Sequence, residues 1–249
     1  MAERVREGVR EGGPEPAPEA RFRLSHQKIA GTLLAVAGIA VLMGIITAEA
    51  FMPDAADYST SASDISHLAG TDPPGSVVVQ PSASIFNAAM ISGGLMILAA
   101  AYFVRGAFGR PGFTVPLAIL GTGVLGVGVF PAPTGGVHDV FALLTFFVGG
   151  LAAVLAYKVE TPPLRYVSVV LGSIPLSILV LMTVLGESAG LTAVLGPGGA
   201  ERWVAYPIVL WLVVFGGYLM GGPGRERPGA GNAATGARRE GRRHEAAPR

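Results

Sequence analysis

The chain has 249 residues, of which 51% are hydrophobic and only 14% are charged, and its mean hydropathy is +0.53. A soluble domain carries about 25% charged residues, so this composition excludes most soluble classes and also disorder of the whole chain. The formal net charge of +1 argues against a nucleic-acid partner, and the absence of cysteine excludes disulfides, thiolate metal sites and cysteine nucleophiles.

Six apolar stretches follow one another along the chain, and each has about the 20 residues that an α-helix needs to cross a bilayer. None of them carries Arg or Lys in its central part. They lie at about 28–50, 84–104, 113–130, 138–157, 164–185 and 203–220. The sequence therefore predicts an all-α, polytopic membrane protein with a six-helix bundle over residues 26–221.

The first stretch follows a polar tail, residues 1–25, which is rich in Gly, Pro, Ala, Glu and Arg and is expected to be disordered. Ala48-Glu49-Ala50 resembles the cleavage site of a signal peptide. The apolar run that precedes it, from Ile29, is longer than the roughly 7–15 residues of a signal sequence. We therefore expect a helix that stays in the membrane, with a cleaved signal peptide as the alternative.

A long connection, residues 51–83, joins the first two stretches. It contains no Lys or Arg, and its acidic residues are Asp54, Asp57, Asp64 and Asp72. Ser and Asp residues suited to helix capping predict a short helix near Asp64–Ala69, and the prolines before Gly75 predict a turn. Connections of this length are commonly either functional or disordered.

The third stretch contains Gly121-Thr122-Gly123-Val124-Leu125-Gly126, which matches the G-x-G-x-x-G pattern of dinucleotide-binding proteins. That pattern binds pyrophosphate between a strand and an exposed helix N-terminus, whereas here it lies inside a membrane span. Small residues inside a span let neighbouring helices approach closely. We therefore predict helix packing at these glycines and expect no cofactor.

Basic residues alternate along the chain in the way that six spans require. Every Lys and Arg except Arg202 lies in the N-terminal tail, after the second stretch, after the fourth stretch or in the C-terminal tail. Cytoplasmic segments of membrane proteins carry this excess of Lys and Arg. We therefore expect a multi-pass protein of the cell membrane with both termini in the cytoplasm, and a disordered basic tail over residues 222–249.

Ionisable side chains near the other, extracytoplasmic side are the candidates for chemistry. The candidate catalytic residues are His138, Asp139, His67, Asp64 and Glu187, and the candidate metal ligands are His67, His138 and Asp139. Carboxylates and imidazoles together bind divalent metals or act as general acids and bases. The alternative is structural, because an acid at a helix N-terminus favours the helix dipole and interfacial residues are hydrated. The spacing matches no known zinc motif.

Several short motifs occur in an order and spacing that resemble a known family. They are Tyr58-Ser59, Ile65-Ser66-His67-Leu68, Pro73-Pro74, Ser84-Ile85-Phe86-Asn87, Gly128-Val129-Phe130-Pro131 and His138. From about Lys28 to Met220 the chain resembles the bacterial and archaeal membrane family called domain of unknown function 998, and distantly resembles FRAG1/DRAM-type membrane proteins. The resemblance implies a six-span fold and no particular activity. Many members are expected to have Asp-Leu-Gly after Ile-Ser, where this chain has His67-Leu68-Ala69-Gly70, so no role for that aspartate is carried over.

Three kinds of function remain open from the sequence. A non-enzymatic protein that binds lipid or has a role in the cell envelope needs no buried charge. The feature that would identify a lipid-binding protein is an apolar groove open sideways to the bilayer. A membrane-embedded hydrolase needs at least three of the outer-side candidates to converge. A small transporter or channel needs a polar path through the bundle, yet the centres of the spans lack charge. We favour the non-enzymatic role, with membrane lipids as partners and no nucleic acid.

Overall fold

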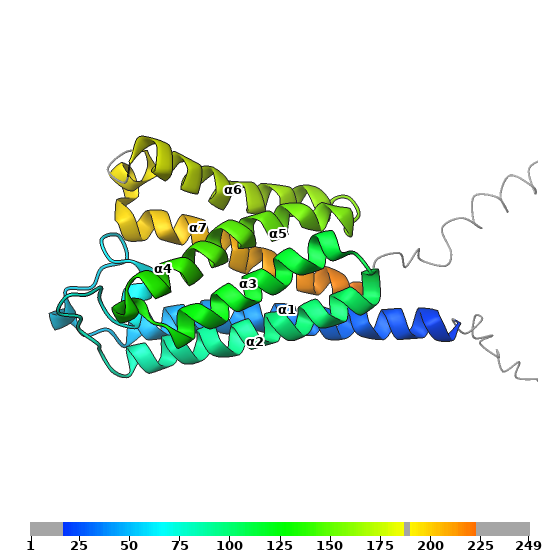
Figure 1. The fold of residues 1–249 in the computed structure, drawn as a ribbon, viewed down its shortest axis with the longest axis horizontal. Coiled ribbons are helices and arrows are strands. Elements are labelled where there is room, and N and C mark those ends of the chain that lie inside the picture. The colour runs from blue at the N-terminus through cyan, green and yellow to red at the C-terminus, as the bar shows by residue number, and fades with distance from the viewer. Residues whose placement is uncertain (1–16, 187–189, 223–249) are drawn as a thin grey trace, which may run out of the picture.

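The computed structural model of the protein describes residues 17–186 and 190–222. This part of the chain contains six helices that are long and apolar enough to cross a membrane, and it contains no strand (Figure 1). The prediction of an all-α bundle with six spans is therefore confirmed.

Four of the spans are continuous helices, namely α1 (Pro18–Ala50), α2 (Ser82–Phe108), α3 (Pro111–Val129) and α6 (Leu164–Leu185). The last span, α7 (Leu191–Gly221), consists of two helical segments joined at Gly196, and the fourth span is composite. The composite fourth span consists of α4 (Gly136–Leu143), the π-helical turn η4 (Leu144–Val148), α5 (Gly149–Leu155) and the 3-10 turn η5 (Ala156–Lys158). A π-helical turn inside a helix often marks a functional region.

Each span packs against the next one in sequence, and α7 also packs against α1. The start of α1 and the end of α7 lie at the same end of the bundle, which we call the tail end (Figure 1). The connection between α1 and α2 lies at the opposite end, which we call the loop end. It contains the 3-10 helices η1 (Asp54–Ala56) and η2 (Ile65–Leu68), and η2 occupies the place predicted for a short helix.

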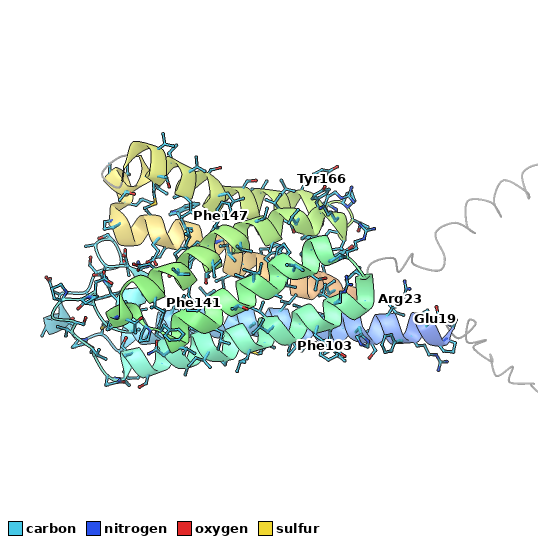
Figure 2. The ribbon with its side chains drawn as sticks, viewed as in Figure 1. Glu19, Arg23, Phe103, Phe141, Phe147 and Tyr166 are labelled. Carbon is cyan, nitrogen blue, oxygen red and sulfur yellow. The ribbon has the colours of Figure 1, made fainter. Side chains whose placement is uncertain are left out.

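The first helix begins earlier than predicted. α1 starts at Pro18, so the expectation of a disordered tail over residues 1–25 is wrong for residues 18–25, and residues 1–16 lie outside the described part. Proline near the helix start loses no hydrogen bond, and Glu19 in the first turn complements the helix dipole. α1 therefore extends past the other helices at the tail end, where Glu19 and Arg23 lie (Figure 2). The expected C-terminal tail, from residue 223 on, also lies outside the described residues.

The last helix also begins earlier than the predicted residue 203. α7 starts at Leu191, and Gly196 interrupts it with a non-helical conformation (φ 76°, ψ 169°) before the helix resumes. A Gly-Pro-Gly-Gly run favours a loop by sequence alone, which explains the late predicted start. In the structure the N–H of Gly198 donates to the carbonyl of Ser61 at 3.0 Å. The loop therefore supplies an acceptor that this helix start needs.

The glycines of the third span are packing positions, as predicted. A Cβ atom at Gly121 would lie 2.9 Å from the backbone nitrogen of Leu98 in α2. A Cβ atom at Gly126 would lie 2.1 Å from the ring of Phe141 in α4. Neighbouring helices therefore approach α3 at distances that only glycine permits.

Large apolar side chains also cover the outside of the bundle. Phe147 on the fourth span and Tyr166 on α6 are both exposed, and Figure 2 shows them on the outer surface. Such a surface is stable when the surrounding solvent is hydrocarbon rather than water. Together with the six apolar helices, it makes the chain a multi-pass membrane protein.

Candidate functional site

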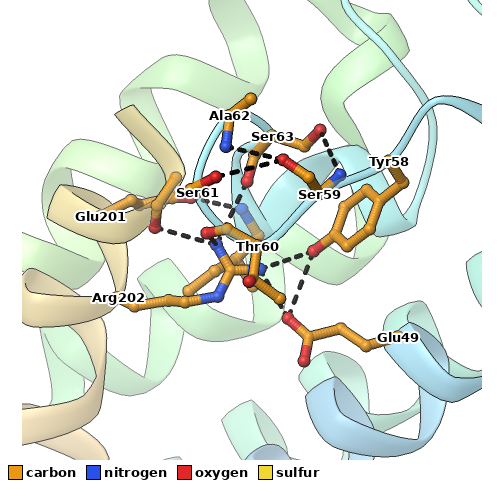
Figure 3. Close-up of polar contacts among 11 residues, drawn as sticks. Glu49, Tyr58, Ser59, Thr60, Ser61, Ala62, Ser63, Glu201 and Arg202 are labelled. Carbon is orange, nitrogen blue, oxygen red and sulfur yellow. Dashed lines mark hydrogen bonds and ion pairs between the residues drawn. The ribbon is translucent and has the colours of Figure 1, made fainter. Parts of the chain in front are cut away.

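The polar centre of the loop end is Arg202 on α7, which is only 9% exposed. Its Nη2 donates to Glu49 Oε1 at 2.5 Å and to the hydroxyl of Tyr58 at 2.6 Å (Figure 3). Its Nη1 donates to the carbonyls of Thr60 (2.8 Å), Ser63 (3.1 Å) and Gly198 (2.8 Å). A buried guanidinium needs a counter-charge and several acceptors, and these groups, which we call the Arg202 cluster, supply both.

Tyr58 and Glu49 join the loop to the end of α1 within this cluster. The Tyr58 hydroxyl donates to Glu49 Oε1 at 3.2 Å while it accepts from Arg202. Burial raises the pKa of Tyr58 above its ordinary value, so the hydroxyl keeps the proton that it donates. The cluster therefore ties together α1, the loop and α7.

Glu201, the residue before Arg202, faces a different space. Its carboxylate accepts a hydrogen bond from the backbone N–H of Ile65, the first residue of η2. Glu201 also lines an internal cavity, whereas Arg202 lines a groove on the outside of α7. Successive residues of an α-helix are rotated by about 100°, which separates the two side chains.

The internal cavity has a volume of about 60 Å³ and lies among α1, α2, α3, the fourth span and α7. This is several times the space that one water molecule needs. The wall is almost entirely apolar, and its polar side chains are Ser66, His138, Thr145 and Glu201. The Thr145 hydroxyl donates to the carbonyl of Phe141 at 2.8 Å, so it is already bonded within its own helix.

The groove on the outside of α7 has a volume of about 530 Å³. At the loop end its wall is polar, with Thr60 and Ser61 beside Arg202. Further along α7 the wall is apolar, and Pro207 and Leu210 form it. The groove also includes Gly199, Leu195, Trp203 and Tyr206. Between Arg202 and Leu210 it therefore runs from polar to apolar residues along a membrane span, while the apolar Leu195 precedes Arg202 on the loop-end side.

The structure places His138 on the wall of the internal cavity, where it is 4% exposed. Its Nδ1 lies 2.8 Å from the carbonyl oxygen of Phe130. Because a carbonyl only accepts, Nδ1 carries the hydrogen of this bond, and in the neutral ring Nε2 is left as an acceptor. Of the residues named from sequence as candidates, His138 is the one that shares the cavity with Glu201.

The other predicted residues lie in different places. His67 pairs with Asp72 at 3.1 Å, Asp139 is exposed in the first turn of α4, and Asp64 precedes η2. Glu187 lies outside the described residues. Within residues 17–186 and 190–222, no three His, Asp or Glu side chains lie close enough to hold a metal ion. The metal candidates His67, His138 and Asp139 are therefore not brought into one ligand set.

Sequence reasoning missed Arg202 and Glu201 as site residues. A signal was present for Arg202, because it is the one basic residue that breaks the alternation of charge along the chain. Glu49 at the end of the first span is an acid on the same side. An unmatched charge and an opposite charge at the same membrane depth indicate a pair.

A second buried polar group lies at the tail end, where Glu160 connects η5 to α6 and is 2% exposed. Its Oε1 accepts from the Ser168 hydroxyl at 2.7 Å, and its Oε2 has no hydrogen-bond partner among the described residues. Arg165 donates to the backbone carbonyl of Glu160 at 2.8 Å. Burial raises the pKa of Glu160 to about 7, although the Ser168 bond and the Arg165 charge act in the opposite direction.

The chain matches a known family model over most of its length. Residues 34–218 match the family model described as a protein of unknown function (DUF998). No curated protein and no solved structure matches the chain. The match covers most of the chain and all six spans in part or whole. The chain therefore belongs to the DUF998 family of proteins of unknown function.

Proposed function

We propose that this protein binds a membrane lipid in the groove along α7. The observation that carries the proposal is the order of the groove wall, which is polar at the loop end and apolar further along the span. Leu210 follows Arg202 by about 12 Å along the helix axis, at 1.5 Å per residue. A lipid has its head group at the interface and its chains inward, so its polarity follows the same order.

The charges around the groove favour a head group that forms hydrogen bonds. Arg202 is already paired with Glu49, so the groove offers no free positive charge. Thr60 and Ser61 line its polar end, and both residues are exposed; the Ser61 hydroxyl also pairs with the Ser59 hydroxyl at 3.3 Å. Hydroxyl groups donate to ester, phosphate and sugar oxygens alike. Trp203 lies on the groove wall and suits an interface between apolar chains and polar head groups.

The test uses Trp203 as a reporter. The chain has two tryptophans, and Trp211 is fully buried with no hydrogen-bond partner for its Nε1 among the described residues. The substitution Trp211→Phe therefore replaces one buried aromatic side chain with another and leaves Trp203 as the only tryptophan. Titration of this protein in detergent with a phospholipid brominated on its acyl chain should quench the fluorescence and saturate near one lipid per protein.

Two matched variants in the Trp211→Phe background complete this experiment. Leu210→Phe adds bulk inside the groove and should weaken binding about tenfold, because overpacking costs about 1–3 kcal/mol. Val214→Phe makes a similar change on the same helix outside the groove and should bind like its parent; Leu210 and Val214 are 46% and 42% exposed. Quenching that never saturates, or that is equal in both variants, would refute a lipid site in the groove.

We infer from the charges that the tail end faces the cytoplasm. In the described residues the tail end carries Arg21, Arg23, Lys28, Arg105, Arg110, Lys158 and Arg165, while Arg202 alone lies at the loop end. An excess of Lys and Arg in short segments beside the spans favours the cytoplasmic side. The Arg202 cluster and the polar end of the groove would then lie at the outer leaflet of the cell membrane.

The absence of cysteine makes this orientation easy to test. Ala55→Cys places one thiol in η1 at the loop end, and Gly112→Cys places one near the start of α3 at the tail end; both positions are exposed. A membrane-impermeant maleimide should label Ala55→Cys in intact cells and Gly112→Cys only after permeabilisation. The reverse pattern would place both termini outside.

A further inference from the structure

We propose that the internal cavity is a separate binding site for a small hydrophobic cation, such as a short alkylamine. The cavity lies on the inner side of α7, and the lipid groove lies on its outer side. Glu201 would hold the charged nitrogen, and the apolar wall would hold the carbon chain. This inference does not depend on lipid binding in the groove, because the two spaces are lined by different residues.

The charge around the cavity selects a cation. A buried carboxyl on an apolar wall lacks the water that stabilises its charged form, and an entering cation favours that form by supplying a counter-charge. Asp64 and Asp72 act electrostatically on Glu201 and add to the negative potential there. Arg202 acts on Glu201 in the opposite direction, but its guanidinium is bonded to Glu49 and lines the other space. An anionic ligand would meet a repulsive field.

The remaining wall suits an ammonium group with an attached alkyl chain. His138 Nε2 is left as an acceptor for an N–H group, because Nδ1 already donates to Phe130. Phe86 and Phe146 contribute aromatic rings to the wall, and the faces of such rings attract cations. Deeper in the bundle the wall consists of aliphatic side chains such as Val124 and Leu212. These side chains match a hydrocarbon chain.

The test compares three ligands of nearly equal size and different charge on the purified full-length protein in detergent. The cavity of about 60 Å³ is smaller than the roughly 150 Å³ that holds benzene, so the ligands must be small. Ethylamine is a cation at neutral pH, ethanol is neutral and formate is an anion. Ethylamine should raise the unfolding temperature in a saturable way, with an apparent affinity at least about tenfold higher than that of ethanol, since a desolvated charge pair is worth more than a neutral hydrogen bond. Formate should have no effect.

Two variants assign the effect to Glu201. Glu201→Gln keeps an acceptor for the Ile65 N–H and should abolish the preference for ethylamine over ethanol. Asp139→Asn removes an exposed acid at the same end of the bundle, outside the cavity, and should behave like wild type, which controls for partition of the amine into the micelle.

A cavity-filling variant gives a second readout that does not need Glu201 to be altered. Val124 is 6% exposed on the cavity wall, and Val124→Phe should abolish saturable binding of both ethylamine and ethanol. The proposal would be overturned by equal affinity for ethylamine and ethanol in wild type, by a preference that survives in Glu201→Gln, or by the absence of saturable binding, which would indicate a cavity that holds only water.

Discussion

Replacement of Arg202 by methionine is expected to destabilise the protein by about 3–5 kcal/mol, the usual cost of removing one partner from a buried ion pair. The change leaves the Glu49 carboxylate buried without its counter-charge. It also leaves the Tyr58 hydroxyl and three backbone carbonyls without their donor. Thermal unfolding in detergent should show the loss. Hydrogen exchange over residues 57–66 should show a loop that is no longer held on α7.

Three further variants separate the contributions to this effect. Arg202→Lys keeps the charge but cannot reproduce the five hydrogen bonds that the guanidinium group donates. Its unfolding temperature should therefore lie between those of wild type and Arg202→Met. Glu49→Gln combined with Arg202→Met should cost less than the sum of the two single changes, because the orphaned charge is gone. Arg110→Met removes an exposed arginine that donates to the Lys158 carbonyl and should cost about 1 kcal/mol or less. If Arg202→Met unfolds like Arg110→Met, the cluster contributes little to stability.

The second large effect is expected at the contact between α1 and α7. A Cβ atom at Gly216 would lie 2.6 Å from the backbone nitrogen of Ala35 and 2.6 Å from the carbonyl oxygen of Gly31. Backbone atoms of a helix cannot move aside individually, so Gly216→Ala must separate the two helices. We expect a loss of about 1–3 kcal/mol, measured as a lower unfolding temperature in detergent.

The neighbouring glycine provides a matched control. A Cβ atom at Gly217 has nothing within 4 Å, so Gly217→Ala adds the same methyl group to the same helix without a contact. Its stability should change by no more than about 1 kcal/mol, the difference in helix propensity between Gly and Ala. Equal effects of the two substitutions would mean that helix propensity, rather than close packing of α1 on α7, determines the cost.

Much of the fold was predictable because hydropathy and length are local properties of the chain. Each span needs about 20 apolar residues whatever its neighbours do, so six spans could be located before any packing was known. The helix boundaries were less predictable where helix and loop residues compete. Gly196 and Pro197 favour a break, and Gly196 is non-helical, yet helical structure lies on both sides of it; the loop carbonyl of Ser61 accepts from the Gly198 N–H where the helix resumes.

The candidate site was only partly predictable. Residue type identified His138, and the structure places it on the cavity wall. The bond between Arg202 and Glu49 joins residues that are 153 positions apart, and no local pattern encodes such a pair. Glu201 lines the internal cavity and Arg202 lines the groove, and this difference depends on where the loop packs against α7. That docking is a property of tertiary packing rather than of any short motif.

The burial of Glu160 has a consequence for the exchange of protons between the protein and its surroundings. With a pKa of about 7, this carboxyl is protonated in about half of the folded molecules at neutral pH, whereas at its ordinary value of 4.5 it would be ionised in nearly all unfolded chains. Folding near pH 7 therefore takes up a fraction of a proton from the buffer. Because the folded state binds more protons, the contribution of Glu160 to stability is greatest below pH 4.5 and is lost as the pH rises through about 7. Acidification at the tail end thus stabilises the folded connection between the fourth span and α6.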